Sequence, residues 1–176
     1  MNQFPRELWS SLPSERLAKA KSLDVNIATE IADKCARAVP EKHKNGLPFG
    51  MPTSVNPFIV LIGVSPGAGE EKDQYSYGKP TVGVPHHGFM WDVPYWQKAR
   101  ILCTEIVKSF SPELSDDECL SVSGSLNLGT KQQGVASEMA LESEIVKWVP
   151  DFITKYLKLK IVVCFGIKSL LKHDLL

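Results

Sequence analysis

The sequence predicts an α/β protein built on a central, mostly parallel sheet. Two short apolar runs, Phe58–Ile62 and Ile161–Phe165, contain no charged side chain, which is typical of strands buried on both faces. Stretches with the apolar spacing of helices precede, separate and follow these runs. Strands that alternate with helices favour right-handed crossovers and a parallel sheet covered on both faces.

The first expected element is a helix over Ser14–Val39. This stretch is rich in Ala, Lys and Glu, and Ile27, Ile31 and Cys35 follow one another at intervals of four residues. That spacing places them on one face of an amphipathic helix. Ser14 is expected to be the N-cap.

The composition changes over Pro40–Pro94, which holds eight of the twelve prolines and eight of the twelve glycines. We expect mostly loop there, with the strand Phe58–Ile62 inside it. A helix is then expected over Trp96–Phe110, with Asp92 and Pro94 at its start.

The remaining elements have weaker patterns. A strand over Cys119–Leu126 is expected to lead into a loop, followed by a helical pattern over Ile145–Tyr156 that Pro150 interrupts. After the strand at Ile161, Gly166 ends the run and a short apolar stretch, Ile167–Leu171, follows.

Length and composition limit the class of protein. The 176 residues suit a single domain, residues 1–176, with an N-terminal helical segment over residues 1–45. Twenty basic and twenty acidic residues cancel, which removes the simplest argument for a nucleic-acid or membrane-surface protein. No apolar run is long enough to span a bilayer, and the N-terminus lacks the pattern of a signal peptide, so a cytoplasmic protein is expected. The four cysteines lie far apart among apolar residues and are expected to be buried free thiols: Cys35, Cys103, Cys119 and Cys164.

Ligands of open parallel sheets bind beyond the carboxyl ends of the strands. The segments that start at Gly63, Asn127 and Gly166 should therefore converge on one edge. Gly63–Gly69 follows a buried strand directly and could expose backbone amides to a ligand, although it lacks the Lys-Ser/Thr of a P-loop. The amide of Asn127 could hydrogen-bond the edge of a nucleobase. The alternative interpretations are that Gly63–Gly69 is only a tight turn after the strand and that Asn127 is an ordinary turn asparagine.

Six of the fifteen aromatic residues fall within 22 positions: Tyr75, Tyr77, Phe89, Trp91, Tyr95 and Trp96. Basic residues interleave with them, so the segment could stack a flat ring and hold nearby phosphates. Packing of these rings into the core is the alternative. His86 and His87 are adjacent, so their side chains cannot readily clasp one metal ion, and exposed loop histidines are expected.

The order of these features resembles the uracil-DNA glycosylase superfamily over about residues 56–172. The matching segments are Phe58–Gly67, Tyr75–Trp96, Ser123–Asn127 and Lys160–Gly166. The resemblance implies a three-layer α/β/α sandwich with a four-stranded parallel sheet. It also implies a DNA-repair hydrolase that flips a uracil-type or damaged base out of DNA and excises it.

Site residues carried over from the resemblance fall into two groups. Ser65 and Gly63 are the implied catalytic residues, and the implied base-binding residues are Val64, Pro66, Gly67, Tyr77, Phe89 and Asn127. The implied partner is DNA or a nucleobase or nucleotide ligand, with no cofactor, metal or membrane. Lys42, His43, Lys44, Lys72 and Lys79 are the local basic candidates.

The chain departs from the family pattern at two places. Ser65 stands where active relatives carry Asp, Asn or Glu, and the chain ends at Leu176, before the family's histidine-containing loop. A truncated domain and natural loss of the loop are both open interpretations. Two other functions also stay open: a catalytically inactive nucleobase or nucleic-acid binding module of the same fold, and a protein-interaction module that uses the aromatic loop.

Overall fold

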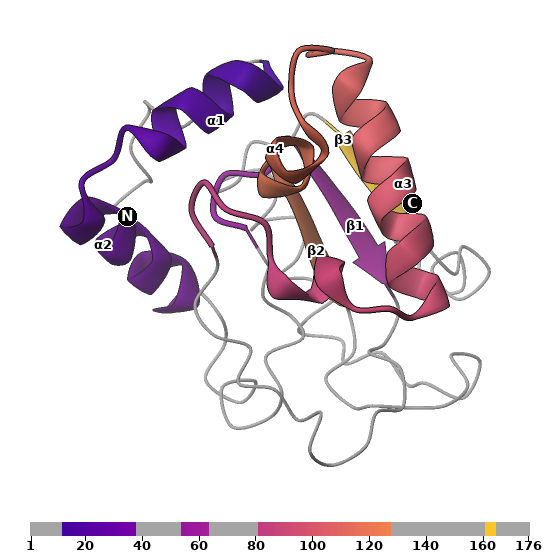
Figure 1. The fold of residues 1–176 in the computed structure, drawn as a ribbon. Coiled ribbons are helices and arrows are strands. Elements are labelled where there is room, and N and C mark those ends of the chain that lie inside the picture. The colour runs from indigo at the N-terminus through magenta and orange to yellow at the C-terminus, as the bar shows by residue number, and fades with distance from the viewer. Residues whose placement is uncertain (1–11, 38–53, 64–80, 128–160, 165–176) are drawn as a thin grey trace.

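The computed structural model describes residues 12–37, 54–63, 81–127 and 161–164. These residues form helices around a small parallel sheet, so the chain is an α/β protein, as predicted (Figure 1). The predicted helical pattern over Ile145–Tyr156, Gly166 and the stretch Ile167–Leu171 lie outside the described residues.

Three parallel strands form the described sheet, in the order β2-β1-β3. The central strand β1 (Ile59–Gly63) pairs on one side with β2 (Ser123–Asn127) and on the other with β3 (Ile161–Cys164). The two apolar strands predicted from the sequence are confirmed to within one residue.

Helix α3 (Pro94–Lys108) is also confirmed. Pro94 occupies the first turn, where its missing N–H costs nothing, and Val93 is the N-cap. The helix runs antiparallel to the strands, with its N-terminus near the arrowhead of β1 (Figure 1). Its buried face consists of Trp96, Ala99, Cys103 and Val107, at the spacing expected of an amphipathic helix.

Both faces of the sheet are buried at its centre. One face carries Ile59 and Leu61, which belong to the main core cluster with the buried residues of α3. The other face carries Val60, Ile62 and Leu126, which lie outside that cluster and are 0%, 6% and 1% exposed. Burial on two faces explains why β1 is a continuous apolar run rather than an alternating one.

The expected strand over Cys119–Leu126 is wrong in its first part. Helix α4 (Asp116–Ser121) occupies that part, and β2 starts only at Ser123. The helix forms because a capping box starts it: Ser115 Oγ accepts from the N–H of Glu118 at 3.4 Å, and the Glu118 carboxylate accepts from the N–H of Ser115 at 3.0 Å.

The expected single N-terminal helix is two helices, α1 (Pro13–Lys21) and α2 (Val25–Arg37). Ser14 lies inside α1 and is not its N-cap; Leu12 is, and its N–H donates to the Glu15 carboxylate at 3.3 Å. The second helix begins separately because the Asp24 carboxylate accepts from the N–H of Asn26 at 2.8 Å.

A buried arginine fixes α1 against the residues that precede β1. Arg16 is 1% exposed, and its Nη1 donates to the carbonyl of Pro57 and to Oδ1 of Asn56 at 3.4 Å. The guanidinium also lies 6.0 Å from the centroid of the Phe58 ring. Burial lowers the pKa of Arg16 to about 10, so the side chain is still charged at neutral pH.

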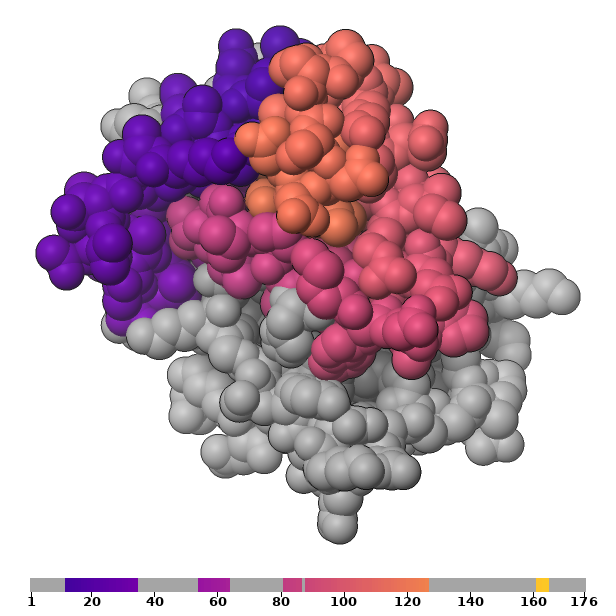
Figure 2. Space-filling view, in the orientation of Figure 1, coloured from indigo at the N-terminus to yellow at the C-terminus, as the bar shows by residue number. Residues whose placement is uncertain are grey.

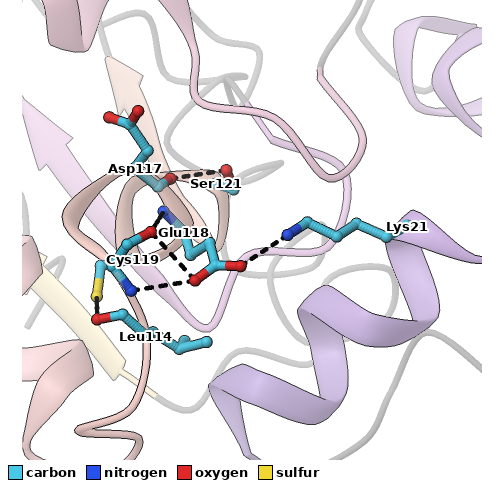
Figure 3. A network of polar contacts seen from close by, with 7 residues as sticks. Lys21, Leu114, Asp117, Glu118, Cys119 and Ser121 are labelled. Atoms are coloured by element: carbon cyan, nitrogen blue, oxygen red, sulfur yellow. Dashed lines mark hydrogen bonds and ion pairs between the residues drawn. The ribbon is translucent and has the colours of Figure 1, made fainter.

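An ion pair links α1 to α4 on the surface. Lys21 Nζ lies 2.8 Å from Glu118 Oε1, within the polar network that starts α4 (Figure 3). The Lys21 hydrogen bond, together with those from Ser115, lowers the pKa of the Glu118 carboxyl to about 2. Glu118 therefore both caps its own helix and contacts a helix about 100 residues earlier in the sequence.

Candidate functional site

The carboxyl edge of the sheet, where the strands end, brings together two of the predicted site segments. Gly63 and Asn127 are direct register partners at the ends of β1 and β2. The expected convergence of these segments is therefore confirmed for this pair, and Gly166 lies outside the described residues. A ligand bound beyond the ends of β1 and β2 would lie next to both Gly63 and Asn127.

The structure describes three of the predicted site residues: Gly63, Phe89 and the backbone of Asn127. Gly63 ends β1 and is buried. The other predicted site residues lie outside the described ranges: Val64, Ser65, Pro66, Gly67 and Tyr77. The basic candidates Lys42, His43, Lys44, Lys72 and Lys79 lie outside them too.

A short loop held by hydrogen bonds leads into α3. It contains the 3₁₀ helix η4 (His87–Met90), whose N-cap His86 accepts from the N–H of Gly88 through Nδ1 at 3.0 Å. Arg100 of α3 donates to the carbonyl of Phe89 at 2.6 Å and to that of Trp91 at 3.3 Å. The loop that begins at residue 81 lies at the surface between α1 and α2 on one side and α4 on the other (Figure 2).

The expectation of an exposed histidine is wrong for His86, which is 4% exposed. Its Nδ1 accepts a hydrogen bond, so this nitrogen carries no proton in the structure. Its role in the loop is that of a helix cap, which the sequence pattern did not indicate.

Trp96 organises the described aromatic residues. The rings of Phe89, Trp91 and Tyr95 lie edge-on to it, with centroids 5.2, 6.0 and 5.0 Å away. Phe89 is 0% exposed, so it packs in the core and offers no face to a base. The packing interpretation therefore holds for Phe89 and Trp96, and the predicted stacking role can rest only on other rings.

Tyr95 is the described ring that joins the surface to the sheet. It is 37% exposed at the start of α3, and the buried Ser125 of β2 lies near enough to influence the pKa of its hydroxyl. Burial raises the pKa of Tyr95, and the nearby side chain of Ser125 opposes that rise. Neither residue was predicted as a site residue, because their proximity joins two elements thirty positions apart and leaves no local pattern.

The buried thiols do not offer a nucleophile. Cys103 and Cys119 are free and 0% exposed, as predicted, and Cys164 is free and half-buried. Burial raises the pKa of Cys103 to about 12, so its thiol is protonated at neutral pH. A protonated, enclosed thiol is unreactive, and Cys103 and Cys119 serve as core residues.

The described residues carry neither a metal cluster nor a membrane-spanning helix. In these ranges, no three side chains of His, Cys, Asp or Glu gather closely enough to hold a metal ion. Of the helices described, none has the length and apolar character needed to cross a membrane.

Comparisons with protein-family models, with curated proteins and with solved structures found no match to this chain.

Proposed function

We propose that the chain is a DNA glycosylase-like hydrolase that binds a flipped uracil-type or damaged base at the carboxyl edge of the sheet. The fold proposed with it is a three-layer α/β/α sandwich with a four-stranded parallel sheet. Support comes from three parallel strands whose centre is buried on both faces, as such a sandwich requires.

The pairing of Gly63 with Asn127 is the observation that carries the proposal. Gly63 begins a glycine-rich segment, Gly63–Gly69, which is suited to exposing backbone N–H groups. Asn127 has a side-chain amide that offers both a donor and an acceptor. A nucleobase edge presents a donor and an acceptor side by side, so one asparagine can bind it in two places. We therefore propose that the amide that binds the base and the backbone amides that stabilise the departing base act at the same edge of the sheet.

Base release would use these residues as follows. Asn127 binds the edge of the flipped base, and the backbone N–H groups of Val64, Ser65 and Gly67 stabilise the negative charge that develops on the departing base. Ser65 orients a water molecule toward the sugar carbon, where positive charge develops. Tyr77 is the proposed stacking ring, while Phe89 supports the loop from within the core.

Labelled oligonucleotides with one uracil, one hypoxanthine or one thymine mismatch test this proposal. After incubation, alkali cleaves abasic sites, and shortened strands report base release. Shortened strands are expected with the unaltered protein and with Asn26→Ala, a control at an exposed position of α2, and not with Asn127→Ala. If the unaltered protein leaves every strand intact, the hydrolase proposal is wrong.

A base-binding module without catalysis is the second candidate. Ser65 favours it, because a hydroxyl is a weaker base than the carboxylate that active relatives of the resembled family carry there. The same oligonucleotides would then bind saturably and stay intact. Titrations that detect no binding would exclude this candidate as well.

A further inference from the structure

Three exposed apolar side chains lie close together in the sequence where the chain enters α3. Met90 ends η4, Val93 is the N-cap of α3 and Tyr95 belongs to its first turn. They are 54%, 43% and 37% exposed, respectively. Apolar side chains that gather on a surface mark a contact with another molecule more often than isolated ones do. We call these three residues the apolar turn.

The backbone that carries Met90 is held on both sides. Arg100 Nη1 donates to the carbonyl of Phe89 at 2.6 Å and to that of Trp91 at 3.3 Å. The N–H of Trp91 also donates to the Gly88 carbonyl at 3.2 Å. Phe89 is 0% exposed, and Trp91 packs against the core cluster. Met90 is therefore an exposed side chain on a fixed turn.

The apolar turn lies toward the end of the sheet where the base is proposed to bind. Helix α3 runs antiparallel to the strands, so its first turn lies near the end of β1 that carries Gly63 (Figure 1). Met90 precedes Pro94, the first residue of α3, by four positions, and four residues span at most about 14 Å. Successive bases of a DNA strand are about 3.4 Å apart, so the neighbours of a base flipped into this edge come within reach of Met90.

Stacked bases are the partner that this arrangement fits. A base that leaves the stack exposes the faces of its neighbours, and an apolar side chain inserted between them offsets part of the cost of unstacking. Methionine suits this role, because it is unbranched and its thioether makes favourable contacts with aromatic rings. A fixed turn suits it as well, since a mobile segment would lose conformational entropy on insertion.

The charges beside the apolar turn suit the phosphates of DNA. Lys98 is exposed and lies one turn after Tyr95 on the same side of α3, because residues three apart are neighbours on a helix. Its ammonium group can pair with a phosphate near the flipped base. The carboxylate of Asp92 accepts from Gln97 Nε2 at 2.6 Å, so it is held toward α3.

We propose that the apolar turn is a wedge for duplex DNA, in which Met90 enters the base stack beside the flipped nucleotide while Val93 and Tyr95 pack against the adjoining sugars. The inference rests on the proposed function of the carboxyl edge. It assigns double-stranded DNA as the substrate, because a single strand has no paired stack that must be held open.

The experiment compares Met90→Ala and Met90→Leu with the unaltered protein. Ile101→Ala is the matched control, because Ile101 is an apolar residue of α3 that is 65% exposed and lies about 10 Å along the helix from Pro94, away from this edge.

Fluorescence anisotropy gives the affinity of each protein for the labelled uracil oligonucleotide, both as a single strand and as a duplex with guanine opposite the uracil. The same oligonucleotides with cytosine in place of uracil give the reference affinities. A 2-aminopurine next to the uracil becomes more fluorescent when the stack opens.

Met90→Ala should weaken binding to the uracil duplex about 10-fold, because it removes most of the apolar surface that fills the gap. Its binding to the single strand should stay within about 2-fold of that of the unaltered protein. Met90→Leu should keep most of the affinity for the duplex, and Ile101→Ala should keep all of it. The fluorescence of 2-aminopurine should rise when the unaltered protein or Met90→Leu binds the duplex, and rise less with Met90→Ala.

The outcomes separate this inference from the proposed function. If the unaltered protein prefers the uracil duplex to the cytosine duplex and Met90→Ala binds it equally well, the proposed function stands and the wedge is wrong. An equal loss of affinity for single strand and duplex, an equal loss in Ile101→Ala, or an unaltered protein that prefers the single strand also overturns the wedge. If the unaltered protein prefers uracil over cytosine in neither form, the proposed function and this inference fall together.

Discussion

Replacing Arg16 with methionine separates the free-energy cost of burying a charge from the gain of satisfying two buried acceptors. Methionine keeps a long unbranched stem but has no donor. The change therefore leaves the carbonyl of Pro57 and Oδ1 of Asn56 without the guanidinium, and removes the charge from above the Phe58 ring. It also removes a cation that is 1% exposed.

The magnitude follows from these opposing effects. Burial lowers the pKa of Arg16 from 12.5 to about 10, which corresponds to a cost of about 3 kcal/mol that methionine avoids. Each acceptor left unsatisfied costs about 1–3 kcal/mol, and the ring contact contributes about 1 kcal/mol. The lost hydrogen bonds and ring contact together exceed the avoided cost of burying the charge. Arg16→Met should therefore lower the free energy of unfolding by about 2 kcal/mol.

Urea unfolding followed by tryptophan fluorescence measures this change. Lys19→Met, an exposed position on the same helix, is the control and should stay within about 0.5 kcal/mol of the unaltered protein. In the part of the chain that the structure describes, Nδ2 of Asn56 has no hydrogen-bond partner, so Asn56→Leu removes an unsatisfied donor together with the acceptor. In that background Arg16→Met should cost about 1 kcal/mol less. An Arg16→Met variant as stable as the unaltered protein would refute the reasoning.

Three further outcomes follow from the described contacts. Gly88→Ala should lower the free energy of unfolding by about 2 kcal/mol in the same assay, because a Cβ there would lie 2.9 Å from His86 Nδ1; an unchanged value would contradict the tight contact. Hydrogen bonding to Lys21 and Ser115 lowers the pKa of Glu118 from 4.5 to about 2, so the contribution of this carboxylate to stability is complete above about pH 4.5 and is lost as the pH falls toward 2. The melting temperature should therefore fall less steeply between pH 4.5 and 2 in Glu118→Gln than in the unaltered protein. Identical slopes for the two proteins would contradict this contribution of Glu118. Cys103 should react with a thiol reagent only after unfolding, since it is 0% exposed and its pKa is raised to about 12; mass spectrometry of labelled native protein would detect any earlier reaction.

The sequence predicted the elements whose burial imposes a simple pattern. β1 is apolar along its length because both of its sides are buried, and α3 has a regular buried stripe behind Pro94. Helix α4 was not predicted, because the apolar residues Cys119 and Leu120 continue toward β2. The sequence contains the capping box of this helix, Ser-x-x-Glu at Ser115 and Glu118. The capping box starts a helix of six residues, although the apolar residues there resemble the beginning of a strand.

The candidate site was predictable where it depends on strand ends alone. Parallel strands end at one edge, so the meeting of Gly63 and Asn127 follows from recognising two strands. The burial of Phe89 and the proximity of Tyr95 to Ser125 depend instead on how α3 lies against the sheet. Such contacts join residues far apart in the chain, and no spacing rule encodes them.

The position of β1 at the centre of the sheet also sets an order of events during synthesis. Its two neighbours both come later in the chain, and the second of them, β3, begins only at Ile161. At about 5–20 residues per second, the ribosome adds the roughly 40 residues from the end of β2 to the end of β3 in a few seconds. Throughout that interval one edge of an entirely apolar strand is without its partner, so the nascent chain can associate with other chains through that edge until β3 is complete.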